Sequence, residues 1–399
     1  MTKQKQPQYR FDGFDGEWEE KKLGELSNIV RGASPRPIQD PKWFDTESDV
    51  GWLRISDVTE QEGRITYLQQ RISKLGQEKT RVLKDSHLLL SIAATVGKPV
   101  INYVKTGIHD GFLVFLDPKF SREFMFQWLD MFRPYWNKYG QPGSQVNLNS
   151  EIVRNQVINL PSLPEQESIG QLFQTVDQLL QLQDQKLATL KAQKQTFLRK
   201  MFPAQGQKVP EIRLQGFDGE WEEKKLGEAV TFLNGRAYKQ NELLKSGKYK
   251  VVRVGNFNTN ETCYYSNLEL DQDKYANNGD LLYLWATNFG PKFWYGEKII
   301  YHYHIWKLNI KNNKSLDKNF LFTWLYFDKE KIKQNTNGTT MVHVTKSMIE
   351  ERLFLFPSLS EQEAIGDFFQ TLDQQMSQTE EKLTELKALK QTLLNRLFV

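Results

Sequence analysis

The sequence predicts an α+β protein with an internal duplication: two mixed α/β domains separated by two long antiparallel coiled-coil helices, with pseudo-twofold symmetry. The segment Phe14–Glu25 recurs letter for letter as Phe217–Glu228, and the segment Pro161–Gly170 recurs nearly unchanged as Pro357–Gly366. The sequences between these shared segments, by contrast, can hardly be aligned. A constant frame therefore carries two different domains, and we expect it to do one kind of job on two targets.

The repeated segments indicate where the parts of the chain begin and end. We expect an N-terminal extension (1–13), a first domain (14–160), a first long helix (161–202), a linker (203–216), a second domain (217–356) and a second long helix (357–399). Short runs of branched and aromatic residues predict strands at 52–56, 88–94, 100–104, 112–116, 251–254, 281–285 and 299–308. Each domain also has one predicted helix, at 121–134 and at 319–327.

Each domain is followed by a long amphipathic helix, the first of which begins near Pro164. Apolar residues recur in steps of three and four, the heptad pattern of a coiled coil, with polar Gln183 and Thr379 at matching places. A helix of about 37 residues is about 55 Å long, and its apolar seam needs a partner. We expect each helix to pack antiparallel against its duplicate, through Ile169, Leu172, Val176, Leu187, Leu190, Ile365, Phe368, Leu372, Leu383 and Leu386.

Composition narrows the class of protein. The chain has 399 residues and is 39% hydrophobic, without an apolar run long enough to span a membrane and without a secretory signal at its start. The one cysteine, Cys263, excludes an internal disulfide and a cysteine-based zinc cluster. These features favour the cytoplasm. The net charge of +4 is a mild preference for polyanions, carried by the second domain, because the first has equal numbers of acidic and basic residues.

The motifs of common enzyme classes are missing from the sequence. It has no phosphate-binding Gly-rich loop, no dinucleotide-binding Gly-x-Gly-x-x-Gly turn and no Asn/Asp-Pro-Pro-Tyr/Phe stretch of amino-methyltransferases. His302 and His304 would share one face of the predicted strand 299–308, which is the one hint of a metal site, but no further ligands accompany them. We therefore expect neither catalytic residues nor a metal.

The recurring segments also form a known pattern. Gly16-Glu17-Trp18 stands near the start of the first copy, and Pro-Ser-Leu-x-Glu-Gln-Glu-x-Ile-Gly enters each long helix. Upstream of those helices lie the Gly-Ser/Thr segments Gly143–Leu148 and Gly338–Val344. This order, domain, helix, domain, helix, covers nearly the whole chain and resembles the specificity subunit of type I restriction–modification enzymes.

The resemblance implies a function without chemistry in this chain. Each variable domain would be a target recognition domain that reads one half of a bipartite DNA site, and the two helices would set the spacing between the half-sites. Two methyltransferase subunits and two restriction/translocase subunits would dock on the chain in the cytoplasm, at the nucleoid. Those partners would bind S-adenosylmethionine, ATP and magnesium, and would supply adenine N6-methylation and restriction of double-stranded DNA.

Candidate DNA contacts stand at matched places in the two domains. Residues 92–97, followed by Lys98, align without a gap with 285–290, which lead to Lys292, and Arg54 and Arg253 sit in equivalent predicted strands. Cations, amides and hydroxyls at strand ends suit base edges and phosphates. The candidates are Arg54, Asp57, Thr95, Lys98, Arg253, Asn256, Thr287, Asn288 and Lys292, with Arg31, Arg36, Arg236 and Lys239 for phosphates. The alternative is structural: the glycines of these loops mark turns, and an arginine pairs with a carboxylate.

A second function remains open at this point. A duplicated, non-catalytic scaffold that binds two protein partners would show the same frame, and the neutral first domain favours it. Salt dependence separates the two, because DNA binding through several phosphates releases counterions and weakens steeply with salt.

Overall fold

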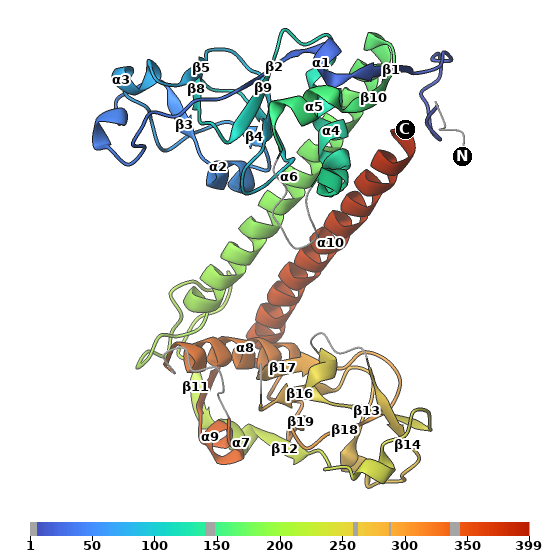
Figure 1. Cartoon of the computed structure of the whole chain (residues 1–399). Helices are drawn as coiled ribbons and strands as arrows, with labels where there is room; N and C mark the ends of the chain where they lie inside the picture. Colours follow the sequence, from blue (N-terminus) through green and yellow to red (C-terminus); the bar gives the residue numbers. More distant parts are fainter. Residues whose placement is uncertain (1–5, 140–147, 258–261, 287–288, 336–343, 399) are drawn as a thin grey trace. The chain divides into compact units, whose positions relative to one another are not determined.

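The computed structural model describes residues 6–139, 148–257, 262–286, 289–335 and 344–398, which form two compact units (Figure 1). The first unit contains Met1–Asp184 and Glu381–Val399, and the second contains Gln185–Glu380. Each unit therefore holds one domain and a part of each long helix. The Gly-Ser/Thr segments of the sequence pattern lie mostly outside the described residues.

The first unit is built on a five-stranded sheet in the order β2–β9–β6–β7–β4, a three-stranded sheet in the order β3–β8–β5, and the pair β1–β10. Its strands are β1 (Glu19–Lys22), β2 (Asn28–Arg31), β3 (Gly51–Leu53), β4 (Arg64–Ile65), β5 (Arg81–Leu83), β6 (Leu88–Ser91), β7 (Pro99–Asn102), β8 (Thr106–Ile108), β9 (Phe112–Leu116) and β10 (Val157–Leu160). Its helices are α1 (Leu23–Leu26), η1 (Pro41–Trp43), α2 (Ile55–Glu60), α3 (Lys74–Gln77), α4 (Arg122–Phe132), η2 (Arg133–Tyr139), α5 (Ser150–Asn155) and the first part of α6 (Leu163–Lys200).

The second unit repeats this plan with two four-stranded sheets, β12–β19–β16–β17 and β14–β13–β18–β15, and the pair β11–β20. Its strands are β11 (Glu222–Lys225), β12 (Val230–Asn234), β13 (Tyr249–Val252), β14 (Tyr264–Ser266), β15 (Tyr275–Ala276), β16 (Leu281–Leu284), β17 (Gly290–Phe293), β18 (Ile299–Tyr301), β19 (Ile305–Ile310) and β20 (Leu353–Phe356). Its helices are α7 (Leu226–Ala229), η3 (Gln240–Glu242), η4 (Val254–Phe257), η5 (Gln272–Lys274), α8 (Lys318–Asn335), α9 (Lys346–Glu350) and the first part of α10 (Leu359–Leu397).

The repeated motifs hold each long helix to its own domain. Arg10 donates two hydrogen bonds to buried Glu165 (2.8 and 2.7 Å), and Arg213 does the same to Glu361 (2.8 and 2.7 Å). The neighbouring glutamine closes a second link, because Gln166 Oε1 accepts from the Ser121 backbone N–H (2.9 Å). A charge-assisted, two-pronged bond fixes direction as well as distance, so the helix leaves each domain at a set angle.

The two long helices pair in antiparallel order within each unit. In the first unit Phe173 packs on Phe398 (ring centroids 5.8 Å apart), and further along α6 Asp177 pairs with Lys390 (2.7 Å). In the second unit the repeated pair is Lys194 and Asp373 (2.5 Å). The predicted seam residues are all buried or half-buried. Fully buried are Ile169, Val176, Leu190, Ile365, Leu372 and Leu383, while Leu172, Leu187, Phe368 and Leu386 are half-buried.

These observations confirm the predicted fold class, but two of the predicted strands differ from the structure. The sequence predicts a single strand over 299–308, but the chain turns at His302–His304, where Ile305 N–H donates to the His302 carbonyl (2.9 Å). It turns because β18 pairs with β13 in one sheet while β19 joins the other sheet. The strand predicted at 52–56 also stops early, at Leu53, because helix α2 begins at Ile55.

Candidate nucleic-acid interface

Four loops of the first unit meet at one edge of its sheets. Leu53 and Ile108 are neighbours at the ends of the parallel strands β3 and β8. Ala33 N–H donates to the Ile108 carbonyl (3.2 Å), and Ile92 N–H donates to the Gly111 carbonyl (2.8 Å). The loops after β2, β3, β6 and β8 are thereby joined. We call them the first loop cluster, which consists of residues 32–36, 54–57, 92–98 and 109–111.

The second unit gathers the equivalent loops in the same way. Val252 and Tyr301 are neighbours in the parallel pair β13–β18, and Arg236 N–H donates to the Tyr301 carbonyl (3.1 Å). Trp285 N–H donates to the His304 carbonyl (3.2 Å). The second loop cluster consists of residues 235–239, 253–256, 285–286 and 302–304. Two predicted DNA contacts of this region, Thr287 and Asn288, lie outside the described residues.

Arg54 and Asp57 form a closed pair in the first loop cluster. The Arg54 guanidinium donates to both Asp57 carboxylate oxygens (2.8 and 3.2 Å), and the Arg54 backbone N–H donates to the same carboxylate (2.8 Å). The Asp57 side chain is buried. Its hydrogen bond raises the pKa of Arg54 above the ordinary value. The carboxylate thus caps helix α2 and holds the cation at once.

The phosphate candidates of the first unit converge on Asp110. Arg36 forms an ion pair with its carboxylate (2.7 Å), and Arg31 donates from Nε to its backbone carbonyl (2.5 Å). Although burial acts to raise it, the Ser34 hydrogen bond and the Arg36 charge together lower the pKa of Asp110. The Arg36 side chain is 74% exposed, so it faces solvent although it is paired.

The loop between β6 and β7 turns its cation toward helix α4. Lys98 Nζ pairs with Asp130 (2.9 Å), and the Thr95 hydroxyl lies 3.4 Å from the Ser91 hydroxyl.

The sheet registers correct the ungapped alignment of the loop between β6 and β7 with its equivalent between β16 and β17. Pro99 lies opposite Leu90 and Pro291 lies opposite Tyr283, so the two prolines are equivalent and the second loop is one residue shorter.

Arg253 occupies the backbone position that is equivalent to Arg54, but its side chain has different neighbours. Its backbone N–H donates to Asn256 Oδ1 (2.9 Å), which repeats the cap formed by Asp57. Its guanidinium lies over the ring of Tyr264, 4.4 Å from the centroid, and is half-buried. In the described part of the chain no carboxylate pairs with it. The two arginines that the sequence aligned are therefore equivalent in backbone position and different in charge environment.

The other candidates of the second unit divide between paired and exposed side chains. Arg236 forms an ion pair with Glu242 (2.8 Å), which raises the pKa of Arg236. The Lys239 backbone N–H donates to the same carboxylate (2.8 Å), while its side chain is exposed. Lys292 is exposed on strand β17.

His109 and His302 occupy equivalent positions in the two loop clusters, and the sequence analysis did not recognise this equivalence. His109 and His302 each directly follow the strand that pairs in parallel with the arginine's strand, and the carbonyl of each packs against a glycine, Gly32 or Gly235, that has no room for a side chain. Partial burial lowers the pKa of His109. Burial first, and then the charges of His304 and Arg253, lower the pKa of His302 to about 4. The differing loop lengths before these residues hide their equivalence in the sequence.

The two histidines that gave the one hint of a metal site do not lie as the sequence predicts. His302 and His304 lie in a turn rather than on one face of a strand, with ring centroids 5.0 Å apart. Among the described residues, no group of three potential ligands lies close enough to hold a metal ion. Over the same residues, no helix is both long and apolar enough to cross a bilayer.

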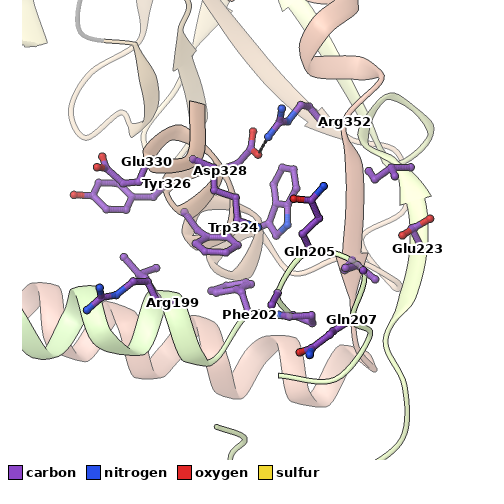
Figure 2. A pocket seen from close by; sticks show the side chains of 18 of the residues that line it. Arg199, Phe202, Gln205, Gln207, Glu223, Trp324, Tyr326, Asp328, Glu330 and Arg352 are labelled. Atoms are coloured by element: carbon purple, nitrogen blue, oxygen red, sulfur yellow. Dashed lines mark hydrogen bonds and ion pairs between the residues drawn. The ribbon is translucent and has the colours of Figure 1, made fainter. Parts of the chain in front are cut away.

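A hollow of about 990 Å³ lies elsewhere in the second unit, between the end of α6, the linker and helix α8 (Figure 2). Its wall combines apolar Phe202 and Trp324 with charged Arg199 and Glu330. On one side Arg352 donates to Asp328, whose pKa is raised by burial in spite of that bond. None of the lining residues belongs to the second loop cluster.

The fold is that of a duplicated protein in which each domain gathers one cluster of loops and is attached to long paired helices. Comparison with known proteins gives the family. The model of the type I restriction modification DNA specificity domain matches residues 15–192 and again 218–388, so the chain belongs to this family. This confirms the resemblance of the repeated motifs, and the family is one of specificity subunits, which are not catalytic.

Individual proteins are similar to this chain in sequence or in fold. The MjaVIII type I restriction enzyme specificity subunit of Methanocaldococcus jannaschii is 25% identical over 208 residues, which cover 48% of this chain and 43% of that protein. The alignment thus spans less than half of that relative. The crystal structure of the type I restriction-modification S subunit from M. genitalium has a TM-score of 0.64 at 15% identity, over 99% of both chains. A chain of a type I restriction–modification system studied for complex assembly and conformational transition has a TM-score of 0.54 at 17% identity, over 96% of this chain and 98% of its own.

Proposed function

We propose that this chain is the DNA sequence-recognition subunit of a type I restriction–modification complex. Each domain reads one half of an asymmetric bipartite site in double-stranded DNA through its loop cluster. The observation that carries the proposal is the repetition of one loop arrangement with different side chains. Equivalent backbones bring the ends of β3 and β8, or of β13 and β18, together at one edge of each unit, where most of the side chains differ, as reading two unlike half-sites requires.

The site should not be a palindrome. Two identical readers on a duplicated frame would favour a symmetric site, but the loop clusters differ at most of their polar positions. The long helices, of 38 and 39 residues, would set the gap between the half-sites. The chain itself would carry no cofactor. Two methyltransferase subunits would bind S-adenosylmethionine, and two restriction subunits would use ATP and magnesium.

The test is co-expression with the methyltransferase subunit of the same host, followed by genome-wide mapping of N6-methyladenine. We expect a single gapped, asymmetric motif. Exchanging residues 217–356 for the second domain of another specificity subunit should then change one half-site and leave the other intact. A motif altered in both halves would contradict one domain per half-site.

The alternative function is a non-catalytic scaffold that binds two protein partners, and the ion pairs of the first unit favour it. There Arg36, Arg54 and Lys98 are all paired with carboxylates, which reduces the charge available to phosphates. Binding of the purified complex to DNA should decide, because phosphate contacts weaken affinity steeply between low and moderate salt. A complex without salt-dependent DNA binding and without methylation would favour the scaffold.

A further inference from the structure

The helices α4 and α8 are equivalent elements, and the start of each long helix fixes their register. A Cβ on Gly170 of α6 would lie 3.0 Å from the Phe124 backbone nitrogen, and one on Gly366 of α10 would lie 3.0 Å from the Phe320 backbone nitrogen. A tryptophan follows four residues later in both helices. Phe124 and Phe320 are therefore matched positions, from which the two helices can be compared residue by residue.

Nine residues after this phenylalanine each unit has a long cation, Arg133 or Lys329, that packs against a glycine of its loop cluster or directly beside it. A Cβ on Gly290, where φ is +133°, would come within 2.6 Å of Lys329 Cδ. One on Gly97, where φ is +77°, would come within 3.3 Å of Arg133 Cγ, with Trp136 closer still. Each glycine thus leaves room for the stem of the cation against the loop between β6 and β7 or between β16 and β17.

Neither cation has a carboxylate as its partner in the part of the chain that the structure describes. Arg133 is exposed and donates from Nε to the Val96 carbonyl (3.2 Å), a bond that leaves both of its terminal nitrogens for other acceptors. Lys329 is half-buried, with Nζ 5.6 Å from the ring centroid of Tyr326. Both side chains are therefore cations that can accept an anionic ligand.

The surroundings of Lys329 favour such an anion. Burial and the charges of Lys333 on α8 and Lys292 on β17 lower the pKa of Lys329 to about 8. Glu330 acts to raise it but lies beside Lys333 (3.5 Å). The charges on the long helices near Tyr326 pair with each other, Lys194 with Asp373 (2.5 Å). An anion from outside would therefore stabilise the charged form of Lys329.

Resting on the proposed function, we infer that Arg133 and Lys329 are positioning residues that each bind one backbone phosphate of the half-site read by their own domain. A helix-borne cation on a phosphate fixes the register of a domain on the duplex and carries no sequence information. The two unlike loop clusters would thus share one anchor, at one position of the duplicated fold, while their other side chains read different bases.

The salt dependence of DNA binding tests both anchors. The full chain in complex with its methyltransferase subunit is titrated with duplex DNA that contains the mapped motif. We expect Lys329→Gln and Arg133→Gln each to reduce the slope of log affinity against log salt by about 0.9, the value for one phosphate contact. The same bases should remain in the methylated motif, because phosphate contacts do not specify them.

Two lysines outside the proposed contacts are the controls. Lys331 stands two residues from Lys329, about 200° around α8, and lines the hollow of the second unit. Lys119 is exposed beyond the end of β9 that lies away from the first loop cluster. Lys331→Gln and Lys119→Gln should leave the slope unchanged.

The affinity should also depend on pH through Lys329. A bound phosphate holds its proton, so affinity falls as the pH rises through the free pKa of about 8. From pH 7 to pH 9 we expect a loss of up to about tenfold, which Lys329→Arg should abolish because a guanidinium stays charged. Lys331→Gln should keep the wild-type loss, although burial lowers the pKa of Lys331 as well.

The outcomes separate the inference from the function beneath it. A wild-type complex that methylates no defined motif and binds DNA without salt dependence overturns the proposed function and the inference with it. With a gapped wild-type motif, three results overturn the inference alone: an unchanged slope in Lys329→Gln or in Arg133→Gln, a change of base in the motif of either variant, or equal pH dependence in wild type and Lys329→Arg. Co-purification with the methyltransferase and the thermal unfolding midpoint establish that each variant is folded.

Discussion

An ion pair between a partly exposed arginine and a buried glutamate anchors each long helix, at Arg10–Glu165 and at Arg213–Glu361. We expect Arg10→Ala to destabilise the first unit by about 3 kcal/mol, because it leaves the 1%-exposed Glu165 carboxylate without its cation. Arg213→Ala should have a similar effect in the second unit. Urea unfolding followed separately for each unit measures both. The exposed pair Lys208–Glu220 is the control, where Lys208→Ala should change stability by about 0–1 kcal/mol. Equal effects at Arg10 and Lys208 would contradict this account.

His302 makes stability depend on pH in a defined window. Its pKa is about 4 in the folded protein, below the ordinary histidine value of about 6.5, so the unfolded chain binds the extra proton between those two values. Stability from this residue is therefore full above about pH 6.5 and is lost as the pH falls toward 4. We expect a loss of about 2 kcal/mol after allowing for partial exposure.

Carboxylates titrate in nearly the same pH range as His302. The contribution of His302 is therefore measured as the difference between the wild type and a variant without this histidine. Unfolding free energies of wild type and His302→Asn should be compared from pH 7.5 to pH 4, with His109→Asn as a second reporter. The wild type should lose more stability on acidification than His302→Asn. Parallel curves would show that His302 is not the titrating group.

One ion pair between the two long helices occurs in both units, but among the described residues its carboxylate has more partners in the first unit than in the second. Asp177 pairs with Lys390 (2.7 Å) and Arg64 (3.1 Å), and it also accepts from the Gln127 amide (2.8 Å). Its equivalent, Asp373, has Lys194 as its ion-pair partner among the described residues. We expect Asp177→Ala to cost about 3 kcal/mol in the first unit and Asp373→Ala about 1 kcal/mol in the second. Chemical unfolding of the two variants checks the order, and a larger loss for Asp373→Ala would be inconsistent with it.

At the scale of elements, what the sequence could predict depended on how local the signal was. The long helices and their N-terminal motifs are visible because heptads and repeated letters lie within one segment. The ion pair of Arg54 could also have been predicted from the sequence, since its partner Asp57 stands only three residues away. The turn at His302–His304 was not, because it depends on which sheet each of the strands β18 and β19 joins. The equivalence of His109 and His302 likewise required the strand pairing.

At the scale of the whole chain, the same backbone hydrogen bond forms near the C-terminal end of each long helix. Ile212 N–H donates to the Lys200 carbonyl (2.9 Å) where the linker leaves α6, and Tyr9 N–H donates to the Arg396 carbonyl (3.0 Å) at the two ends of the chain (Figure 1). Residues 201–211 separate the first pair. Joining Val399 to Met1 would separate the second pair by 397–399 and 1–8, which is the same number of residues. The direct fusion therefore needs no added linker.

We expect a circular permutant with Val399 joined to Met1, and new ends between Gln205 and Gly206, to fold with its two loop clusters intact. Both linker residues are exposed, and a Cβ at Gly206 would meet nothing within 4 Å. Closing one segment while opening another of equal length leaves the loop entropy nearly unchanged, so stability should shift by no more than about 1 kcal/mol. A permutant opened between Leu89 and Leu90, inside a buried strand, is the control and should not fold. Thermal unfolding and the methylated motif of the complex measure the result. A linker permutant as unstable as the strand permutant would mean that the bonds at Tyr9 and Ile212 are not equivalent in the folded protein.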